Sequence, residues 1–368
     1  MEQKKNVRIL VADNHEDGMY KCRGELLARL AMEYDVYVSV PKGKYTKALQ
    51  DLGCHFENLT IDRRGVNAFS EFGLLRRYHK LLDRVNPDIV LTYSIKPNVY
   101  LGILCGRRKI PYIANVTGLG SSMQAGTGQK LMMALYRMGL KNADTVFFQN
   151  ETNRDIMLQH HLVHGDYALI PGSGVNLITH CYEPYPERDV PIHFLTIGRI
   201  MKEKGTDELI DAARIVKKKY PYVLFRMIGF YDGDYQGKIQ RAQEEGLIEF
   251  CGHQDDVHAY IRQCHAVIHP SYHEGMANAL LEAAATGRPV IASDIPGCRE
   301  AFDAGVSGLP CEAQNTENLA DAILRFIDLP YEKKVSMGKA GREKMEREFD
   351  RNIVIEKYLK KIKELTAS

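Results

Sequence analysis

The 368-residue sequence contains no tryptophan and no run of about 18 apolar residues, the length that a membrane-spanning helix needs. Basic and acidic side chains nearly balance, at 49 and 47, so the chain lacks the strong positive charge of a nucleic-acid-binding protein. Its first residues lack the basic, apolar and small-residue pattern of a signal peptide. We therefore expect a cytoplasmic protein that neither spans a membrane nor binds nucleic acid.

Two familiar cofactor patterns are also missing. The eight cysteines form no CxxC pair, and no histidine follows at the spacing of a zinc motif, which favours free thiols. The stretch after the first predicted strand, ADNHEDGMYKCRG (12–24), lacks the GxGxxG fingerprint of nicotinamide dehydrogenases. Gly18 would either let a phosphate approach the backbone before the following helix or form a plain turn.

Short apolar runs rich in Val, Ile and Phe are present throughout and predict buried parallel strands. They lie at 7–13, 35–40, 88–94, 112–118, 145–150 and 167–172, and again at 193–199, 223–229, 248–253, 266–271 and 289–294. Segments of helical periodicity at 24–34, 74–85, 207–220 and 277–287 alternate with them. This alternation predicts an α/β protein made of two Rossmann-like, doubly wound domains that face each other across a cleft.

The boundary between these domains is predicted in the segment 172–191, which is rich in Gly, Pro and Asn. We assign residues 1–175 to an N-terminal domain and residues 176–349 to a C-terminal domain. After Pro330 the sequence is charged and helical to its end.

The clearest chemical pattern follows a predicted strand, in SYHEGMANALLEAAATGRPVIASDIPGCRE (271–300). Glu274 ends the loop, and a helix is predicted from about Asn278 with Glu282 in its second turn. The N–H groups at the start of that helix would bind a diphosphate. The two carboxylates would accept hydrogen bonds from vicinal hydroxyls, one on a sugar and one on a ribose. The alternative is that Glu274 only interacts with the helix dipole and that Glu282 is a solvated helix residue.

A second pattern, IGRIMKEKG (197–205), follows the first strand of the second half. Arg199 and Lys204 would neutralise a diphosphate there, although such a pair is also common on solvated surfaces. Asp232 and Asp234 spell the Asp-x-Asp of metal-dependent transferases, but their Gly-rich loop is better interpreted as solvated. We therefore expect no metal site.

Together these two segments resemble the GT4 family of nucleotide-sugar glycosyltransferases, which have the GT-B fold. TYSIKPNVYLGIL (92–104), NVTGLGSSM (115–123), FFQN (147–150) and PGSGVN (171–176) are similar to bacterial members that build surface polysaccharides or lipid-linked glycans. The resemblance implies a retaining, metal-independent transfer of a hexose or N-acetylhexosamine from a nucleotide-sugar, which we expect to be a UDP-sugar. The acceptor is expected to be a glycan carried on a lipid, and no cofactor beyond the donor is implied.

The resemblance also implies the roles of particular residues. Arg199, Lys204 and Glu274 would act in catalysis. The donor would be bound by Gly18, Arg199, Lys204, His253, Gln254, Asp255, Glu274, Gly275, Met276, Ala277, Asn278 and Glu282. We place Lys96, Gly118 and Gly120 at the acceptor. A final helix from about residue 350 would cross back to the first domain.

Two questions stay open at this level. Basic residues beside apolar stretches at 74–85 and 128–143 are typical of interfacial helices and also of core helices with a basic outer face. We expect peripheral attachment to the cytoplasmic face of the inner membrane. Competing functions are a sugar-nucleotide 2-epimerase of the same fold, a transferase with a soluble acceptor, and a non-catalytic nucleotide-binding module.

Overall fold

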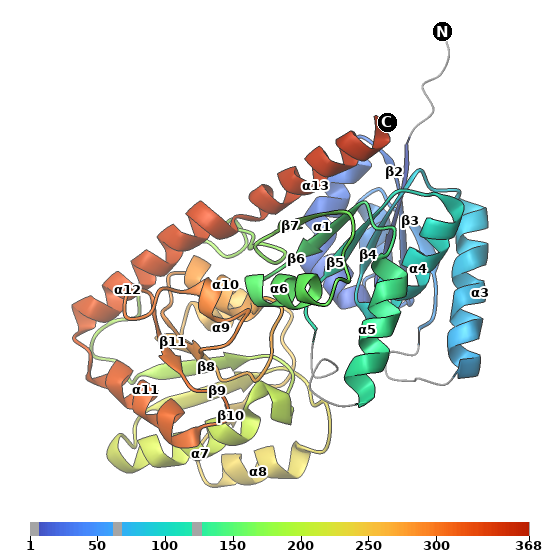
Figure 1. The fold of residues 1–368 in the computed structure, drawn as a ribbon. Coiled ribbons are helices and arrows are strands. Elements are labelled where there is room, and N and C mark those ends of the chain that lie inside the picture. The colour runs from blue at the N-terminus through green and yellow to red at the C-terminus, as the bar shows by residue number, and fades with distance from the viewer. Residues whose placement is uncertain (1–6, 62–67, 120–126, 368) are drawn as a thin grey trace. The chain divides into compact units, whose positions relative to one another are not determined.

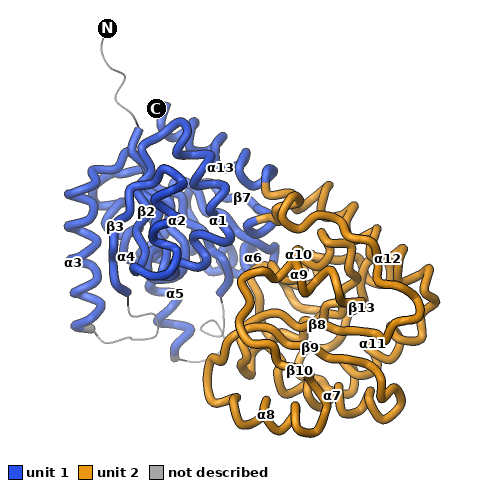
Figure 2. Tube along the Cα trace, turned by 180° about the vertical axis from the view of Figure 1, so that it is seen from behind, with its two compact units in different colours: residues 1–173, 352–368 blue, residues 174–351 orange. Residues whose placement is uncertain are grey.

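The computed structural model describes residues 7–61, 68–119 and 127–367, and it divides the chain into two compact units (Figures 1 and 2). Unit 1 comprises residues 1–173 and 352–368, and unit 2 comprises residues 174–351. The chain passes from unit 1 to unit 2 inside the predicted linker segment. Both units are α/β, as the alternation of strands and helices predicted.

Unit 1 contains a seven-stranded parallel sheet with the order β3-β2-β1-β4-β5-β6-β7. The strands are β1 (Arg8–Ala12), β2 (Asp35–Val40), β3 (His55–Asn58), β4 (Ile89–Tyr93), β5 (Tyr112–Val116), β6 (Thr145–Phe148) and β7 (Asp166–Leu169). The helices between them are α1 (Glu16–Ala31), α2 (Thr46–Asp51), α3 (Ala68–Val85), α4 (Ile95–Arg108), α5 (Thr127–Leu140) and α6 (Glu151–Gln159).

Helices cover both faces of this sheet, because successive strand side chains point to opposite faces. Leu10 of β1 lies in an apolar cluster with residues of α3, α4 and α5. Its neighbours Ile9 and Val11 lie in a second cluster with α1. A strand buried on both faces is apolar at most positions, which is why the strands appear as nearly continuous apolar runs.

The last helix of the chain, α13 (Arg351–Thr366), belongs to the second of these clusters. Val354, Leu359 and Ile362 are buried there, and the Tyr358 hydroxyl hydrogen-bonds the side chain of Asn115 in β5. These contacts place the end of the chain in unit 1, and the helix begins close to residue 350, where the crossing was expected.

Unit 2 contains a six-stranded parallel sheet with the order β10-β9-β8-β11-β12-β13. The strands are β8 (His193–Ile197), β9 (Leu224–Ile228), β10 (Glu249–Phe250), β11 (Ala266–His269), β12 (Val290–Ser293) and β13 (Gly308–Cys311). The helices are α7 (Thr206–Lys219), α8 (Gln236–Glu244), α9 (Val257–Ile261), α10 (Asn278–Ala285), α11 (Thr316–Asp328) and α12 (Tyr331–Lys344), with short turns η2 (Lys202–Lys204), η3 (Arg299–Ala301) and η4 (Met345–Phe349).

Two strands were not predicted, and each lies at an edge of its sheet. The side chains of β3, HFEN, are exposed or half-buried, so they form no apolar run. Strand β13, GLPC, contains Pro310, which cannot donate a backbone hydrogen bond and is tolerated at an edge. Edge strands bury less apolar surface, and the signal that revealed the central strands is therefore weak in them.

Candidate functional site

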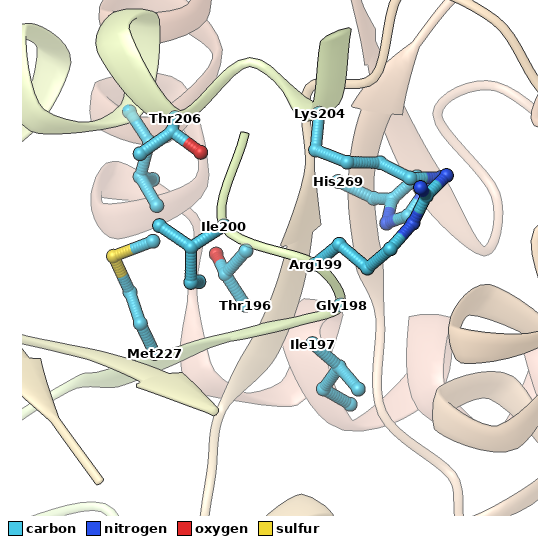
Figure 3. A pocket seen from close by; sticks show the side chains of 10 residues that line it. Thr196, Ile197, Gly198, Arg199, Ile200, Lys204, Thr206, Met227 and His269 are labelled. Carbon is cyan, nitrogen blue, oxygen red and sulfur yellow. The ribbon is translucent and has the colours of Figure 1, made fainter. Parts of the chain in front are cut away.

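A small hollow in unit 2 opens at the carboxyl ends of three adjacent strands, β9, β8 and β11 (Figure 3). Its lining includes Thr196 of β8, Met227 of β9 and His269 of β11. Strand order reverses between β8 and β11, and ligands of open α/β sheets bind at such a switch point. Figure 3 shows Arg199, Lys204 and His269 extending toward the same side of this hollow.

Lys204, Glu274 and His269 form a connected group at this edge of the sheet. The Lys204 ammonium donates to Glu274 Oε1, and His269 Nε2 lies 2.7 Å from the same oxygen. The side chains of Glu274 and His269 are only 12% and 7% exposed. One carboxylate oxygen, shielded from water, is therefore shared by two potential cations.

This arrangement fixes the charge of Glu274. Burial by itself would raise the pKa of the carboxyl group, since it penalises the charged form. The charge of Lys204 and the hydrogen bond from His269 act in the opposite direction and prevail, so the pKa lies well below its ordinary value. Glu274 is therefore ionised throughout the physiological pH range, and its carboxylate can act only as a hydrogen-bond acceptor.

Backbone contacts hold the two loops that carry Lys204 and Glu274 together. The N–H of Tyr272 donates to Glu203 O at 2.9 Å, and Ser271 Oγ donates to the same oxygen at 3.2 Å. Gly205, the residue after Lys204, has φ +70°, and a Cβ there would lie 2.1 Å from Pro270 O. Only glycine allows this approach, so the loop geometry depends on it.

Arg199, which follows β8, has a carboxylate partner of its own. Its guanidinium donates to Asp232 Oδ2 at 2.7 Å, and the Asp232 side chain is 15% exposed. Asp232 is the first residue of the Asp-x-Asp pattern, and in the structure its carboxylate neutralises Arg199. The hollow is thus bordered by two cations, each oriented by a buried or half-buried acid.

Two family models match the chain, one on each unit. The model for Glycosyl transferases group 1 matches residues 183–344, and the model for Glycosyl transferase 4-like matches residues 9–150. The chain belongs to the GT4-type glycosyltransferases.

A relative of this glycosyltransferase is similar along almost its whole length. It is the N,N'-diacetylbacillosaminyl-diphospho-undecaprenol alpha-1,3-N-acetylgalactosaminyltransferase of Campylobacter jejuni, 28% identical over 346 residues that span 89% of this chain and 90% of the relative.

Solved structures of similar shape have the GT-B fold. Sucrose-phosphate synthase from Thermosynechococcus elongatus superposes with a TM-score of 0.81 at 19% identity, over 98% of this chain and 99% of that protein. HepE from Anabaena, in complex with UDP-glucose, superposes with a TM-score of 0.78 at 17% identity, over 97% and 99% of the two chains. The glycosyltransferase therefore has the two-unit α/β fold expected from its sequence.

The remaining residues of unit 2 that were predicted to bind the donor lie in two loops and in the first turns of α10. Gly275, Met276 and Ala277 precede α10, whose first residue is Asn278 as predicted, and Ala277 makes no side-chain cap. Glu282 lies in the second turn, 4.0 Å from His180 Nε2. Three further residues predicted to bind the donor, His253, Gln254 and Asp255, follow β10. His253 Nε2 lies 3.5 Å from Asp255 Oδ1, and the Gln254 side chain donates to Cys251 O.

The structure corrects the prediction for Gly18. Helix α1 begins at Glu16, so Gly18 lies in its first turn and not before it. Arg23 donates to Gly18 O at 3.2 Å, and a Cβ on Gly18 would lie at an ordinary 3.7 Å from that guanidinium. The position therefore neither requires glycine nor forms the open turn that was expected to approach a phosphate.

The predicted acceptor residues belong to unit 1. Lys96, in the first turn of α4, donates to Glu71 at 2.5 Å, and both side chains are largely buried. Gly118 follows β5, and Gly120 lies outside the described residues. Their part in acceptor binding remains a prediction.

Two features of the structure, one in each unit, were not predicted from the sequence. His269 is the last residue of β11, five positions before Glu274. The sequence did contain an indication of its role, because a histidine stands there at the end of a predicted strand, next to a loop with predicted site residues. In unit 1, Ser94 has φ +67° at the carboxyl end of β4 and hydrogen-bonds Asp13, which follows β1. Strained backbone of this kind is typical of functional positions, and no sequence pattern indicates it.

Gly297 supports the Glu274 loop from behind. Its φ is +86°, and a Cβ there would lie 2.7 Å from Gly275 O and 2.8 Å from Glu274 O. Its carbonyl oxygen accepts the N–H of Ala277 at 2.8 Å. The glycine therefore sets the position of the loop between β11 and α10.

We expect Gly297→Ala to destabilise the protein by about 1–3 kcal/mol and also to abolish most donor binding, because a Cβ displaces the Glu274 backbone. Gly246→Ala is the matched control, since Gly246 has φ +67° but no atom within 4 Å of a Cβ. Urea denaturation and UDP titration would compare the two variants. Equal donor affinity in both would contradict a positioning role for Gly297.

Proposed function

We propose that this glycosyltransferase moves a hexose or N-acetylhexosamine from a UDP-sugar to a lipid-linked glycan, with retention of anomeric configuration and without a metal ion. The group formed by Lys204, Glu274 and His269 at the switch point of unit 2 is the observation that carries the proposal. The Campylobacter relative is named for the addition of N-acetylgalactosamine to a diphospho-undecaprenol-linked sugar, and HepE has been crystallised with UDP-glucose. These names favour an N-acetylhexosamine and a uridine donor.

The proposed chemistry develops negative charge on the departing UDP. The bond between the anomeric carbon and the phosphate oxygen breaks, and a bond from that carbon to the acceptor oxygen forms on the same face. The acceptor proton passes to the departing phosphate oxygen. Arg199 and Lys204, with the backbone N–H groups at the start of α10, would stabilise the diphosphate as it leaves.

The acids beside these cations orient them in advance. Glu274 holds the Lys204 ammonium at the strand end, and Asp232 holds the Arg199 guanidinium. A cation that is already in place requires no reorganisation when charge develops, which is the condition for strong electrostatic stabilisation. Glu274 would in addition accept hydrogen bonds from the hydroxyls of the transferred sugar.

The pairing of Asp232 supports the proposal that no metal is needed. An Asp-x-Asp motif binds a divalent ion through its carboxylates, and here the first of them is engaged by Arg199. Two fixed side-chain cations would perform the charge neutralisation that a metal ion performs in other transferases.

Product analysis tests this proposal directly. Purified protein is incubated with UDP-N-acetylgalactosamine, UDP-N-acetylglucosamine or UDP-glucose and a polyprenyl-diphosphate-linked sugar, with EDTA or with Mn²⁺, and the new anomeric linkage is assigned by NMR. We expect an α-linked product, formed equally well in EDTA. A β-linkage or loss of activity in EDTA would overturn retention or metal independence, and conversion of donor without acceptor would favour the epimerase.

Attachment to a membrane surface is proposed for unit 1. Phe69 and Phe72 at the start of α3 are 89% and 70% exposed, and Leu131 and Met138 of α5 are also exposed. Lys130 and Arg137 lie beside the latter two in the sequence. Apolar side chains interspersed with basic ones suit an anionic lipid surface. No helix in the described part of the chain has the length and apolar character needed to cross a bilayer.

Replacing Phe69 and Phe72 by serine is expected to reduce binding to anionic vesicles by at least about tenfold, since each phenyl ring contributes about 1.5–3 kcal/mol when buried. Vesicle flotation at physiological salt measures this. Tyr222→Ser, at an 83% exposed position in unit 2, is the control and should bind as the parent does. Unchanged flotation of the double variant would argue against attachment through α3.

A further inference from the structure

Three side chains with metal-binding atoms lie close together in unit 2, although their spacing in the sequence does not match a zinc motif. Cys181 Sγ lies 3.6 Å from Glu183 Oε1 and 3.8 Å from His258 Nε2, and the last two atoms are 3.2 Å apart. No other trio of His, Cys, Asp or Glu in the described residues brings its ligand atoms this close together. Cys181 and Glu183 belong to the segment that enters unit 2, and His258 lies in α9.

These separations match the edges of a zinc coordination tetrahedron. Bonds of about 2.3 Å to sulfur and about 2.0–2.2 Å to nitrogen or oxygen, at tetrahedral angles, place the ligand atoms about 3.4–3.6 Å apart. The three observed distances differ from these values by about 0.3 Å or less. Thiolate and imidazole are ligands that Zn²⁺ accepts and that Mg²⁺ and Ca²⁺ avoid.

Contacts around His258 orient its ring. Thr286 Oγ1 donates its proton to Glu282 O at 2.8 Å and lies 3.4 Å from His258 Nδ1. His258 Nε2 lies beside the carboxylate of Glu183. With the proton on Nδ1, directed at the Thr286 hydroxyl, Nε2 would be free to bind a metal ion. A second shell that orients the ring in this way is characteristic of metal-binding histidines.

We propose that Cys181, Glu183 and His258 form a Zn²⁺ site, with the fourth position left to solvent because Cys181 is exposed. Zinc bound there would link the segment that enters unit 2 to α9, between residues 75 positions apart in the chain. Buried Arg288 already ties the same segment down, since its guanidinium donates to Glu183 O at 3.0 Å and to Pro184 O at 2.8 Å. The metal would therefore act as a structural brace and take no part in sugar transfer.

Metal titration of the full-length protein tests the site. After treatment with EDTA and its removal, Zn²⁺ is titrated by calorimetry, and Co²⁺ is titrated as a spectroscopic probe. We expect one Zn²⁺ per chain, a rise in melting temperature that EDTA reverses, and a thiolate-to-cobalt charge-transfer band in the near ultraviolet.

Two variants and one control make the result specific. Cys181→Ser should lose the cobalt band, and His258→Ala should weaken Zn²⁺ binding at least tenfold. Cys251→Ser, at a half-exposed cysteine elsewhere in unit 2, should change neither. Melting temperatures of the metal-free variants show whether they fold. The proposal would be overturned if the cobalt band persisted in Cys181→Ser, or if the parent bound Zn²⁺ no more tightly than His258→Ala does. The three side chains would then form only a hydrogen-bonded cluster.

Discussion

Lys204→Ala is expected to lower kcat by about 10²–10³-fold, the effect of removing one preorganised charge donor from a transition state. The ammonium is held by Glu274 beyond the strand ends. Steady-state assays with a UDP-sugar, together with UDP titration, measure the loss.

Lys202→Ala is the matched control for this variant. Lys202 belongs to the same short turn, η2, carries the same charge and is exposed. Its removal should leave kcat within about twofold of the parent value. A similar loss in both variants would indicate a general effect of charge, and an unchanged kcat in Lys204→Ala would remove the lysine from the site.

Glu274→Ala is expected to produce the largest loss of stability, about 3 kcal/mol, because it leaves the Lys204 ammonium half-buried without its carboxylate. The double replacement Lys204→Met with Glu274→Leu should recover most of this stability, since neither position then carries an unpaired charge. It should remain inactive. Urea denaturation of the single and double variants measures stability, and activity assays on the same variants measure catalysis separately. A double variant no more stable than Glu274→Ala would show that the unpaired Lys204 ammonium does not account for the loss of stability.

The same carboxylate gives a pH dependence of known sign. Its pKa in the folded protein lies below the ordinary value of 4.5, so folding favours the ionised form. The stabilisation is complete above pH 4.5 and is lost as the pH falls from that value toward the folded pKa. Between pH 5 and 3, therefore, the parent should lose more stability than Glu274→Ala.

The sequence indicated the centre of each sheet better than its edges. Runs such as DVYVSV coincide with β2 because helices cover both faces of the sheet, and the buried positions of this strand are valines apart from the small Ser39. At the edges, β3 and β13 mix polar residues or proline into four-residue strands, and only pairing with a neighbouring strand reveals them.

The residues of the candidate site were likewise predicted only in part from the sequence. Arg199, Lys204 and Glu274 lie in the segments that follow β8 and β11, so the topological rule alone brings them to one edge of the sheet. His269 was missed because it looked like the end of a buried strand. The trio around Cys181 was missed for another reason: its members are joined by folding across 75 residues, and zinc motifs are recognised by short spacings.

The position of α13 bears on how the protein is made. Unit 2 is one continuous segment, whereas unit 1 needs residues from both ends of the chain. Domains usually fold in the order in which the ribosome releases them. Here the apolar surface of unit 1 that α13 covers stays open until residues Arg351–Thr366 have left the exit tunnel. Nascent chains that have released unit 2 but still hold α13 in the tunnel would thus expose that surface to chaperones.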